Sequence, residues 1–273
     1  MNMNFIERII YNLSGEMERP GNYGWFHLMF IAIVIAASLF FLLKLKDCSD
    51  RTERILLLAF WAALVLFETY KQLQFSVSFN DAGTEGWDYQ WYAFPYQFCD
   101  TPLYLLPFAA LLKEGKARSA VKMFLATYTL FAGLVVYIYP NDVFIRTIGV
   151  DIQTMFHHGT QIVLGLFLGA RLIRSRQMKL PVFVRAIGIF VIMVAVAFAL
   201  NNLVPLITED TFNMYYIGPV FECTLPVLSD IYAHVPYAVF LAVYVLGFTF
   251  AASLLFGAFT AAKKLRAKRG APA

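Results

Sequence analysis

The chain has 273 residues, of which 60% are hydrophobic and only 15% are charged, and its mean hydropathy is +0.63. Soluble domains carry roughly 25% charged residues. This composition therefore excludes a cytosolic globular enzyme, a disordered chain and a nucleic-acid-binding protein. The net charge of +4 becomes informative only when the charges are placed along the chain. The sequence predicts an all-α, polytopic membrane protein.

Residues 1–24 form a predicted outward segment that precedes the membrane domain. Within it, Phe5, Ile9, Ile10 and Leu13 recur at helical spacing, which predicts a short amphipathic helix. Such a helix either lies on the outer membrane surface or packs against the end of a helix bundle. The pattern leaves both arrangements open.

Long apolar stretches follow one another through the rest of the chain. A helix needs about 20 predominantly apolar residues to cross the hydrocarbon core of a membrane, and seven stretches meet this requirement. They define one transmembrane domain over residues 25–262, followed by a basic cytoplasmic tail over residues 263–273. The seven predicted spans are residues 25–45, 55–77, 91–113, 122–140, 152–171, 184–206 and 234–262.

Basic and acidic residues alternate between the predicted connections. Most Lys and Arg residues flank the first, third and fifth connections or lie in the tail. By contrast, Glu85 and Asp88 lie in the second connection, and Glu209 and Glu222 lie in the sixth. Positive residues concentrate on the cytoplasmic side of membrane proteins. The charges therefore predict an outward amino terminus, a cytoplasmic carboxyl terminus and a multi-pass protein of the cell membrane.

Polar residues occur at a similar depth in four of the predicted spans. From a rise of about 1.5 Å per residue and a hydrocarbon core of about 30 Å, they lie about 6 to 12 Å below the outer boundary. The inner half has no counterpart in the prediction. Ionisable groups inside spans usually mark a functional site, so we expect one polar pocket that opens outward. Its expected lining, with the last two residues as a lid, comprises Glu68, Lys71, Gln97, Asp100, His157, Gln161, Asn202, Asn213 and Tyr215.

Each of these residues also has a purely structural interpretation. Glu68 and Lys71 are three positions apart on one helix face and can neutralise each other. Asn202 can tie helices together through a hydrogen bond. A disulfide between Cys99 and Cys223 is a further arrangement that the sequence leaves open.

Cys99 is the candidate nucleophile of the predicted pocket. Pro95 and Pro102 interrupt the helix around it and free backbone amides, and histidines lie at matching depth. An imidazole can accept the proton of a thiol, and the thiolate can then attack a carbonyl carbon. At this depth the available carbonyls are the acyl esters of outer-leaflet lipids. The predicted reaction is acyl transfer from a membrane phospholipid or another fatty-acyl donor, and we expect neither a metal nor a cofactor.

Several short motifs in a fixed order resemble those of the YwaF-like integral membrane proteins, which are related to the transmembrane protein 164 family of eukaryotes. The resemblance covers nearly the whole chain. The motifs are Glu68 with Lys71-Gln72, Pro95-Tyr96-Gln97-Phe98-Cys99, His158-Gly159, Asn202 and Phe212-Asn213-Met214-Tyr215.

The resemblance implies an acyltransferase that moves fatty-acyl chains onto ether phospholipids by means of a membrane cysteine. Carried over to this chain, it makes Cys99 the nucleophile and His158 its base. A more distant similarity to the androgen-induced membrane hydrolases, which use a threonine and a histidine, points to the same chemistry. Two positions depart from the family pattern: Gln97 replaces a frequent histidine, and Asp100 replaces a small polar residue. A carboxylate beside a thiol disfavours the thiolate.

Three other functions compete with acyl transfer. A proton-coupled transporter of small solutes would use Glu68, Asp100 and His158 as a relay, although no inverted repeat is visible. A non-catalytic protein would use the pocket to bind lipid. A retinal receptor is excluded, because no lysine lies between Asp230 and Lys263 in the seventh span to form a Schiff base.

Overall fold

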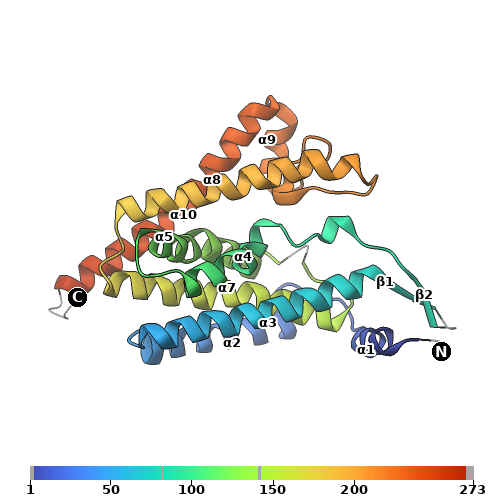
Figure 1. Cartoon of the computed structure of the whole chain (residues 1–273), viewed down its shortest axis with the longest axis horizontal. Coiled ribbons are helices and arrows are strands. Elements are labelled where there is room, and N and C mark those ends of the chain that lie inside the picture. Colours follow the sequence, from blue (N-terminus) through green and yellow to red (C-terminus); the bar gives the residue numbers. More distant parts are fainter. Residues whose placement is uncertain (1–2, 81–82, 141–142, 269–273) are drawn as a thin grey trace.

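The computed structural model describes residues 3–80, 83–140 and 143–268, and most of these residues are helical (Figure 1). The all-α prediction is confirmed, apart from one short hairpin. The α-helices are α1 (Phe5–Leu13), α2 (Trp25–Phe40), α3 (Asp50–Ser76), α4 (Thr101–Leu111), α5 (Lys116–Phe124), α6 (Leu130–Ile138), α7 (Ile148–Arg174), α8 (Leu180–Leu203), α9 (Leu228–His234) and α10 (Tyr237–Lys268).

Short turns of other helix types extend or precede several of these helices. The π-helical segments η1 (Phe41–Leu45) and η4 (Leu125–Thr129) extend α2 and join α5 to α6. The 3-10 turns are η2 (Trp91–Ala93), η3 (Phe98–Asp100), η5 (Val204–Leu206) and η6 (Met214–Tyr216).

Four helices among the described residues are long and apolar enough to cross a membrane. They span Trp25–Leu45, Lys116–Ile138, Leu180–Leu206 and Tyr237–Leu265. The first coincides with the predicted span 25–45. The helix α10 continues to Lys268, six residues beyond the predicted span, and residues 269–273 of the predicted tail lie outside the described residues.

The helix α7 lies at the centre of the bundle, where it contacts α2, α3, α5, α6 and α10. Of its 27 residues, 18 are buried. Close approach to α6 requires small residues: a Cβ atom built on Gly133 would lie 2.7 Å from the carbonyl oxygen of His158. This packing explains how α7 tolerates polar side chains, because they face protein and not lipid.

The predicted span over residues 91–113 is interrupted, as its prolines indicated, and its first third is not a regular helix. The turn η2 ends at Ala93, the chain then runs without regular structure to Gln97, and only η3 and α4 are helical. Pro95 is the physical reason. A proline has no N–H to donate and disfavours helical backbone in the residue before it, and Phe94 accordingly has an extended ψ of 132°. Cys99 therefore lies at the beginning of a helical segment and not in the middle of a span.

The amino-terminal segment and an unpredicted hairpin lie together at one end of the bundle, and the carboxyl terminus lies at the opposite end (Figure 1). The hairpin pairs β1 (Val77–Asn80) with β2 (Gly83–Trp87) in antiparallel register. In α1, Ile10 is buried, whereas Phe5 is 80% exposed. The helix therefore packs on the bundle with one face and presents apolar side chains on another.

A hydrogen bond joins α1 to the hairpin. The indole Nε1 of Trp87 donates to Glu7 Oε1 at 3.0 Å, and Glu7 also closes a capping box with Asn4. The bond from Trp87 and the backbone amide of Asn4 lower the pKa of Glu7. The Glu7 carboxylate thus stays charged and hydrogen-bonded at neutral pH. Its bond to Trp87 holds α1 and the hairpin together at this end of the bundle.

A buried ion-pair network lies near the other end of α3, about 22 Å from Glu68 at 1.5 Å per residue. Glu53 is fully buried and accepts from Arg118 Nη2 at 3.0 Å, from Lys122 Nζ at 2.6 Å and from Arg171 Nε at 2.5 Å. The sequence placed these residues in the connections or at the ends of the predicted spans, and the structure buries Glu53, Arg118 and Lys122 in the bundle. The network joins α3, α5 and α7, because one carboxylate satisfies cations from two other helices.

Candidate functional site

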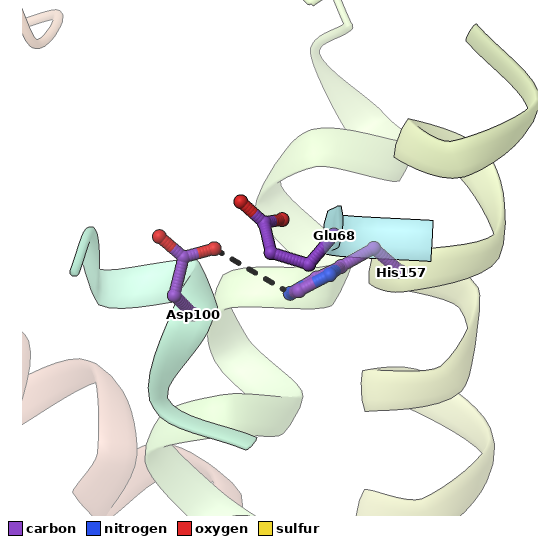
Figure 2. Close-up of side chains that lie close together, drawn as sticks. All are labelled: Glu68, Asp100 and His157. Carbon is purple, nitrogen blue, oxygen red and sulfur yellow. Dashed lines mark ion pairs between the residues drawn. The ribbon is translucent and has the colours of Figure 1, made fainter. Parts of the chain in front are cut away.

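Three buried ionisable side chains from different elements meet in the half of the bundle nearer α1. Glu68 comes from α3, Asp100 from η3 and His157 from α7, and Figure 2 shows their side chains converging. Their relative exposures are 5%, 3% and 2%. One ligand atom from each lies within 4.8 Å of the others. The structure therefore brings together these three of the residues expected to line the pocket, from three of the four spans that the sequence indicated.

Glu68 is neutralised by its own helix. Lys71 Nζ lies 2.8 Å from Glu68 Oε1, and Gln72 Nε2 donates to the same oxygen at 2.7 Å. From α7, Gln153 Nε2 lies 3.4 Å from Glu68 Oε2. The chemical types of Glu68, Asp100 and His157 suit a divalent cation. However, the Lys71 ammonium group already pairs with the Glu68 carboxylate, which such a cation would need as a ligand.

The residues around Cys99 form a tight turn that starts α4. The backbone N–H of Gln97 donates to Asp100 Oδ2 at 2.7 Å, which anchors the Asp100 side chain. The other carboxylate oxygen, Oδ1, lies 3.9 Å from Cys99 Sγ and 3.8 Å from His157 Nε2. Asp100 thus stands between the thiol and the imidazole. Cys99 is half-buried as a residue, whereas Asp100 and His157 are buried.

The two adjacent histidines have different surroundings. His157 Nε2 lies 2.9 Å from the Cys99 carbonyl oxygen, and since a carbonyl can only accept, this nitrogen carries the proton. Gln161 Nε2 donates to the same carbonyl at 2.7 Å. His158 Nδ1 instead lies 2.8 Å from Thr154 O on its own helix. Among the described contacts, therefore, His157 reaches the Cys99 turn, whereas the resemblance assigns the base to His158.

The expected lid residues Asn213 and Tyr215 are tied to the same turn. Gln97 Nε2 donates to Asn213 O at 3.0 Å, and Gln97 Oε1 accepts from Tyr215 N at 2.8 Å. Asn201 makes a second pair of hydrogen bonds to this segment. Its side-chain amide donates to Met214 O at 2.9 Å and accepts from Met214 N at 2.7 Å.

The expected role of Asn202 differs from its observed position. Its side chain is exposed and bonds Phe198 O on its own helix. Successive helical residues point about 100° apart, so the buried amide belongs to Asn201. Sequence reasoning missed Gln153, and it named Gln72 only as part of a family motif and not as a site residue. A polar residue at helical spacing from His157 was the available signal for Gln153, four positions earlier.

The two other questions raised by the sequence have simple outcomes. All three cysteines, Cys48, Cys99 and Cys223, are free, so the Cys99–Cys223 disulfide does not form. A cavity of about 10 Å³ lies beside the site and is lined in part by Pro102, Thr160 and Gln161. This volume is close to the room that one water needs, so this cavity alone does not hold an acyl chain.

The site is suited to proton transfer from a nucleophile. It combines a free thiol, a carboxylate within hydrogen-bond range of the sulfur and an imidazole beside that carboxylate.

Comparison with known proteins adds a family but no closely related structure. No curated protein and no solved structure matches the chain. A sequence model of the TMEM164 family matches residues 22–260, most of the chain, which confirms the resemblance drawn from the ordered motifs. The chain is a membrane protein that belongs to the TMEM164 family.

Proposed function

We propose that this membrane protein is a lipid acyltransferase or acyl hydrolase in which Cys99 is the nucleophile. The proposal rests on three neighbouring groups at the start of α4: the Cys99 thiol, the Asp100 carboxylate and the His157 imidazole. Cys99 Sγ lies 3.9 Å from Asp100 Oδ1, and the same oxygen lies 3.8 Å from His157 Nε2. The thiol therefore lies beside a buried proton acceptor, and the backbone N–H of Gln97 holds that acceptor in place.

Asp100 and not a histidine receives the thiol proton in this reaction. A carboxylate beside a thiol disfavours a standing thiolate, so deprotonation accompanies attack. Cys99 Sγ bonds the acyl carbonyl carbon of a phospholipid, the ester C–O bond breaks, and Asp100 passes the proton to the departing alkoxide oxygen. The acceptor hydroxyl, of a second lipid or of water, then attacks the thioester carbonyl carbon, the C–S bond breaks, and Asp100 passes the proton of that hydroxyl to the departing Cys99 thiolate. The imidazole of His157, whose Nε2 lies 3.8 Å from Asp100 Oδ1, stabilises the carboxylate in the steps in which it is negative.

We place the proposed reaction in the outer leaflet of the cell membrane. We also propose that seven segments of the chain cross this membrane. Two observations support this topology. Helical residues occupy each of the seven apolar stretches, although the third is short. The amino-terminal cap with the hairpin and the carboxyl terminus also lie at opposite ends of the bundle (Figure 1). The basic residues of the tail favour a cytoplasmic location for the carboxyl-terminal end of the bundle.

Reporter fusions test this topology. A reporter fused after Ala273 should be active in the cytoplasm, and one inserted beside Gly86 in β2, where a Cβ atom would meet open space, should be active outside. The charge distribution is the reason, because Lys and Arg resist translocation. A third reporter, inserted beside Ser175 after α7, serves as an internal control and should report the cytoplasm. Activity of the Gly86 and Ala273 fusions on one side would contradict the seven-span topology.

Lipid mass spectrometry tests the reaction itself. We expect membranes that contain the protein to show a redistribution of acyl chains in one phospholipid class, compared with membranes that lack it. Unchanged lipids would reject acyl transfer.

A proton-coupled transporter is the second candidate, and one observation favours it. Glu68, Asp100 and His157 are buried within 4.8 Å of one another, with Lys71 on Glu68, so a proton has adjacent sites to occupy. Against a relay across the membrane stands the ion-pair network of Glu53, because its carboxylate is already shared by Arg118, Lys122 and Arg171. Solute-dependent proton uptake by proteoliposomes, with unchanged lipids, would favour the transporter.

A further inference from the structure

The turn that follows α8 has an unusual backbone. Tyr215 and the next residue, Tyr216, have φ values of 57° and 56°, which lie in the left-handed region. Side chains other than glycine rarely adopt this region, and bulky ones do so less often than Asn or Asp. Two consecutive tyrosines in this conformation require a surrounding structure that enforces it. Strained backbone of this kind concentrates at functional sites.

Three side chains enforce the turn. Gln97, two residues before Cys99, bonds both Asn213 O and Tyr215 N. Asn201 bonds both backbone groups of Met214. Asn213 Oδ1 in turn accepts from Gly218 N at 2.7 Å. The backbone of Tyr215 is thus fixed relative to the Cys99 turn by the side chain of Gln97.

The strained backbone directs the Tyr215 side chain into the protein, where it lies beside the Cys99 turn. Tyr215 is 1% exposed, and its ring centroid lies 5.8 Å from that of Phe98 and 5.7 Å from that of Tyr96. Its hydroxyl oxygen is buried and has no hydrogen-bond partner among the described residues. A buried hydroxyl without a partner is costly. The fold therefore maintains both backbone strain and an unsatisfied donor at one residue.

The Tyr215 hydroxyl remains a donor over the whole working pH range. Tyr215 lies in the connection between the sixth and seventh predicted spans, and burial raises its pKa well above the ordinary value. The nearby Tyr96 and Tyr244, and then Asp100 and Cys99, raise this pKa further. The ring contact with Phe98, the residue before Cys99, places Tyr215 beside the turn that carries the nucleophile.

We propose that the Tyr215 hydroxyl is a catalytic hydrogen-bond donor that binds the carbonyl oxygen of the acyl group attacked by Cys99. This inference rests on the proposed acyl transfer. When Sγ bonds the carbonyl carbon, the π electron pair moves onto the carbonyl oxygen, and the Tyr215 O–H donates to that oxyanion without giving up its proton. When the ester C–O bond breaks, the electron pair returns, the thioester remains on Cys99, and the alkoxide takes the thiol proton held by Asp100.

Two other buried tyrosines show why Tyr215 is singled out. Tyr244 also has a hydroxyl without a partner among the described residues, but it lies in the regular helix α10 and makes no described hydrogen bond to the Cys99 turn. Tyr96 lies beside Tyr215, and its hydroxyl bonds the carbonyl oxygen of Met193 at 3.3 Å. Tyr215 alone among these three combines a strained backbone, a bond to the Cys99 turn and an unsatisfied hydroxyl.

The test compares Tyr215→Phe with Tyr96→Phe in the full-length protein in detergent. The probe is phosphatidylcholine supplied without an acceptor lipid. Intact-protein mass spectrometry measures the rate of acyl-thioester formation on Cys99, and heating measures the unfolding midpoint. Loss of an oxyanion donor should lower the acylation rate of Tyr215→Phe about 100- to 1000-fold. Its midpoint should stay equal to the wild-type value or rise, because the hydroxyl has no bond to lose. Tyr96→Phe should lower the midpoint and leave the rate within a few-fold.

Each remaining outcome overturns the assignment in a distinguishable way. A wild-type rate in Tyr215→Phe removes the hydroxyl from the reaction, while acylation of the wild type still supports Cys99. A lower rate that comes with a loss of thermal stability equal to that of Tyr96→Phe assigns Tyr215 a structural role. A wild-type protein that never acquires acyl mass on Cys99 rejects the proposed function, and the role of Tyr215 with it.

Discussion

Replacing Cys99 with serine should lower acyl transfer by about three orders of magnitude or more, as expected when a catalytic nucleophile is removed. Serine keeps the size and polarity of the residue, but its hydroxyl is a far weaker nucleophile beside a carboxylate. The fold should be unaffected, because the described contact of the thiol is one weak interaction at 3.9 Å. The measurement is acyl exchange in proteoliposomes, together with an acyl-thioester that accumulates on wild-type Cys99 when acceptor is scarce.

Cys48→Ser is the matched control, since Cys48 is another free, partly buried cysteine, whose carbonyl oxygen accepts from Arg171 and not from the Cys99 cluster. It should retain activity. Near-normal lipid remodelling by Cys99→Ser would show that Cys99 is a packing residue. The Glu68–Asp100–His157 cluster would then have to be tested as a transporter relay.

Variants of the two histidines decide between the family resemblance and the geometry. The resemblance assigns the base to His158, whereas His157 lies 2.9 Å from the Cys99 carbonyl oxygen and 3.8 Å from Asp100. We expect His157→Gln to lower activity more than His158→Gln. Residues that act together give double variants that are scarcely worse than the single ones, so Cys99→Ser with His157→Gln should show no additive loss. The reverse order of effects would restore His158 as the functional imidazole.

Replacing Glu53 with alanine should lower the free energy of unfolding by about 3 to 5 kcal/mol, the usual cost of breaking a buried ion pair from one side. Glu53 is fully buried, and its carboxylate accepts hydrogen bonds from Arg118, Lys122 and Arg171 on two other helices. Without it, three cations are left around an unfilled space. The measurement is resistance to unfolding by heat or denaturant in detergent micelles.

Glu114→Ala provides the control for this variant. Glu114 also pairs with Arg118, but its side chain is 66% exposed. Exposed pairs contribute about 0 to 1 kcal/mol, so this variant should remain close to the wild type. Equal stability losses in the two variants would contradict the view that Glu53 is the centre of the network.

The identity of the polar side chains at the site was readable from the sequence, but their partners were not. Glu68 and Asp100 interrupt apolar stretches and therefore attract attention in any sequence. The choice between His157 and His158 depends on the rotation of α7 about its axis. An amphipathic helix shows its rotation by its apolar stripe, but α7 is buried on most sides and has no such stripe.

The inner network escaped prediction for a related reason. Arg118 and Lys122 lie at the end of an apolar stretch beside a basic connection, so charge counting assigned them to a solvated cytoplasmic loop. Whether such a cation is solvated or buried depends on a carboxylate about 65 residues away in sequence, Glu53, whose pairing with Arg118 is a tertiary contact. Burial of a charge is stable only when that partner is in place.

The sequence by itself determined the membrane class, the positions of most helices and the segregation of charge, because these follow from composition and from runs of about 20 apolar residues. It also contained the Pro95 that ends the regular structure before Cys99, because a proline cannot donate the backbone hydrogen bond of a helix. Only the tertiary structure decided which histidine reaches Cys99, that Asn201 and not Asn202 faces inward, and that a strained turn inserts Tyr215 beside the nucleophile. These features depend on helix rotation and on contacts between residues far apart in the chain, which no local pattern encodes.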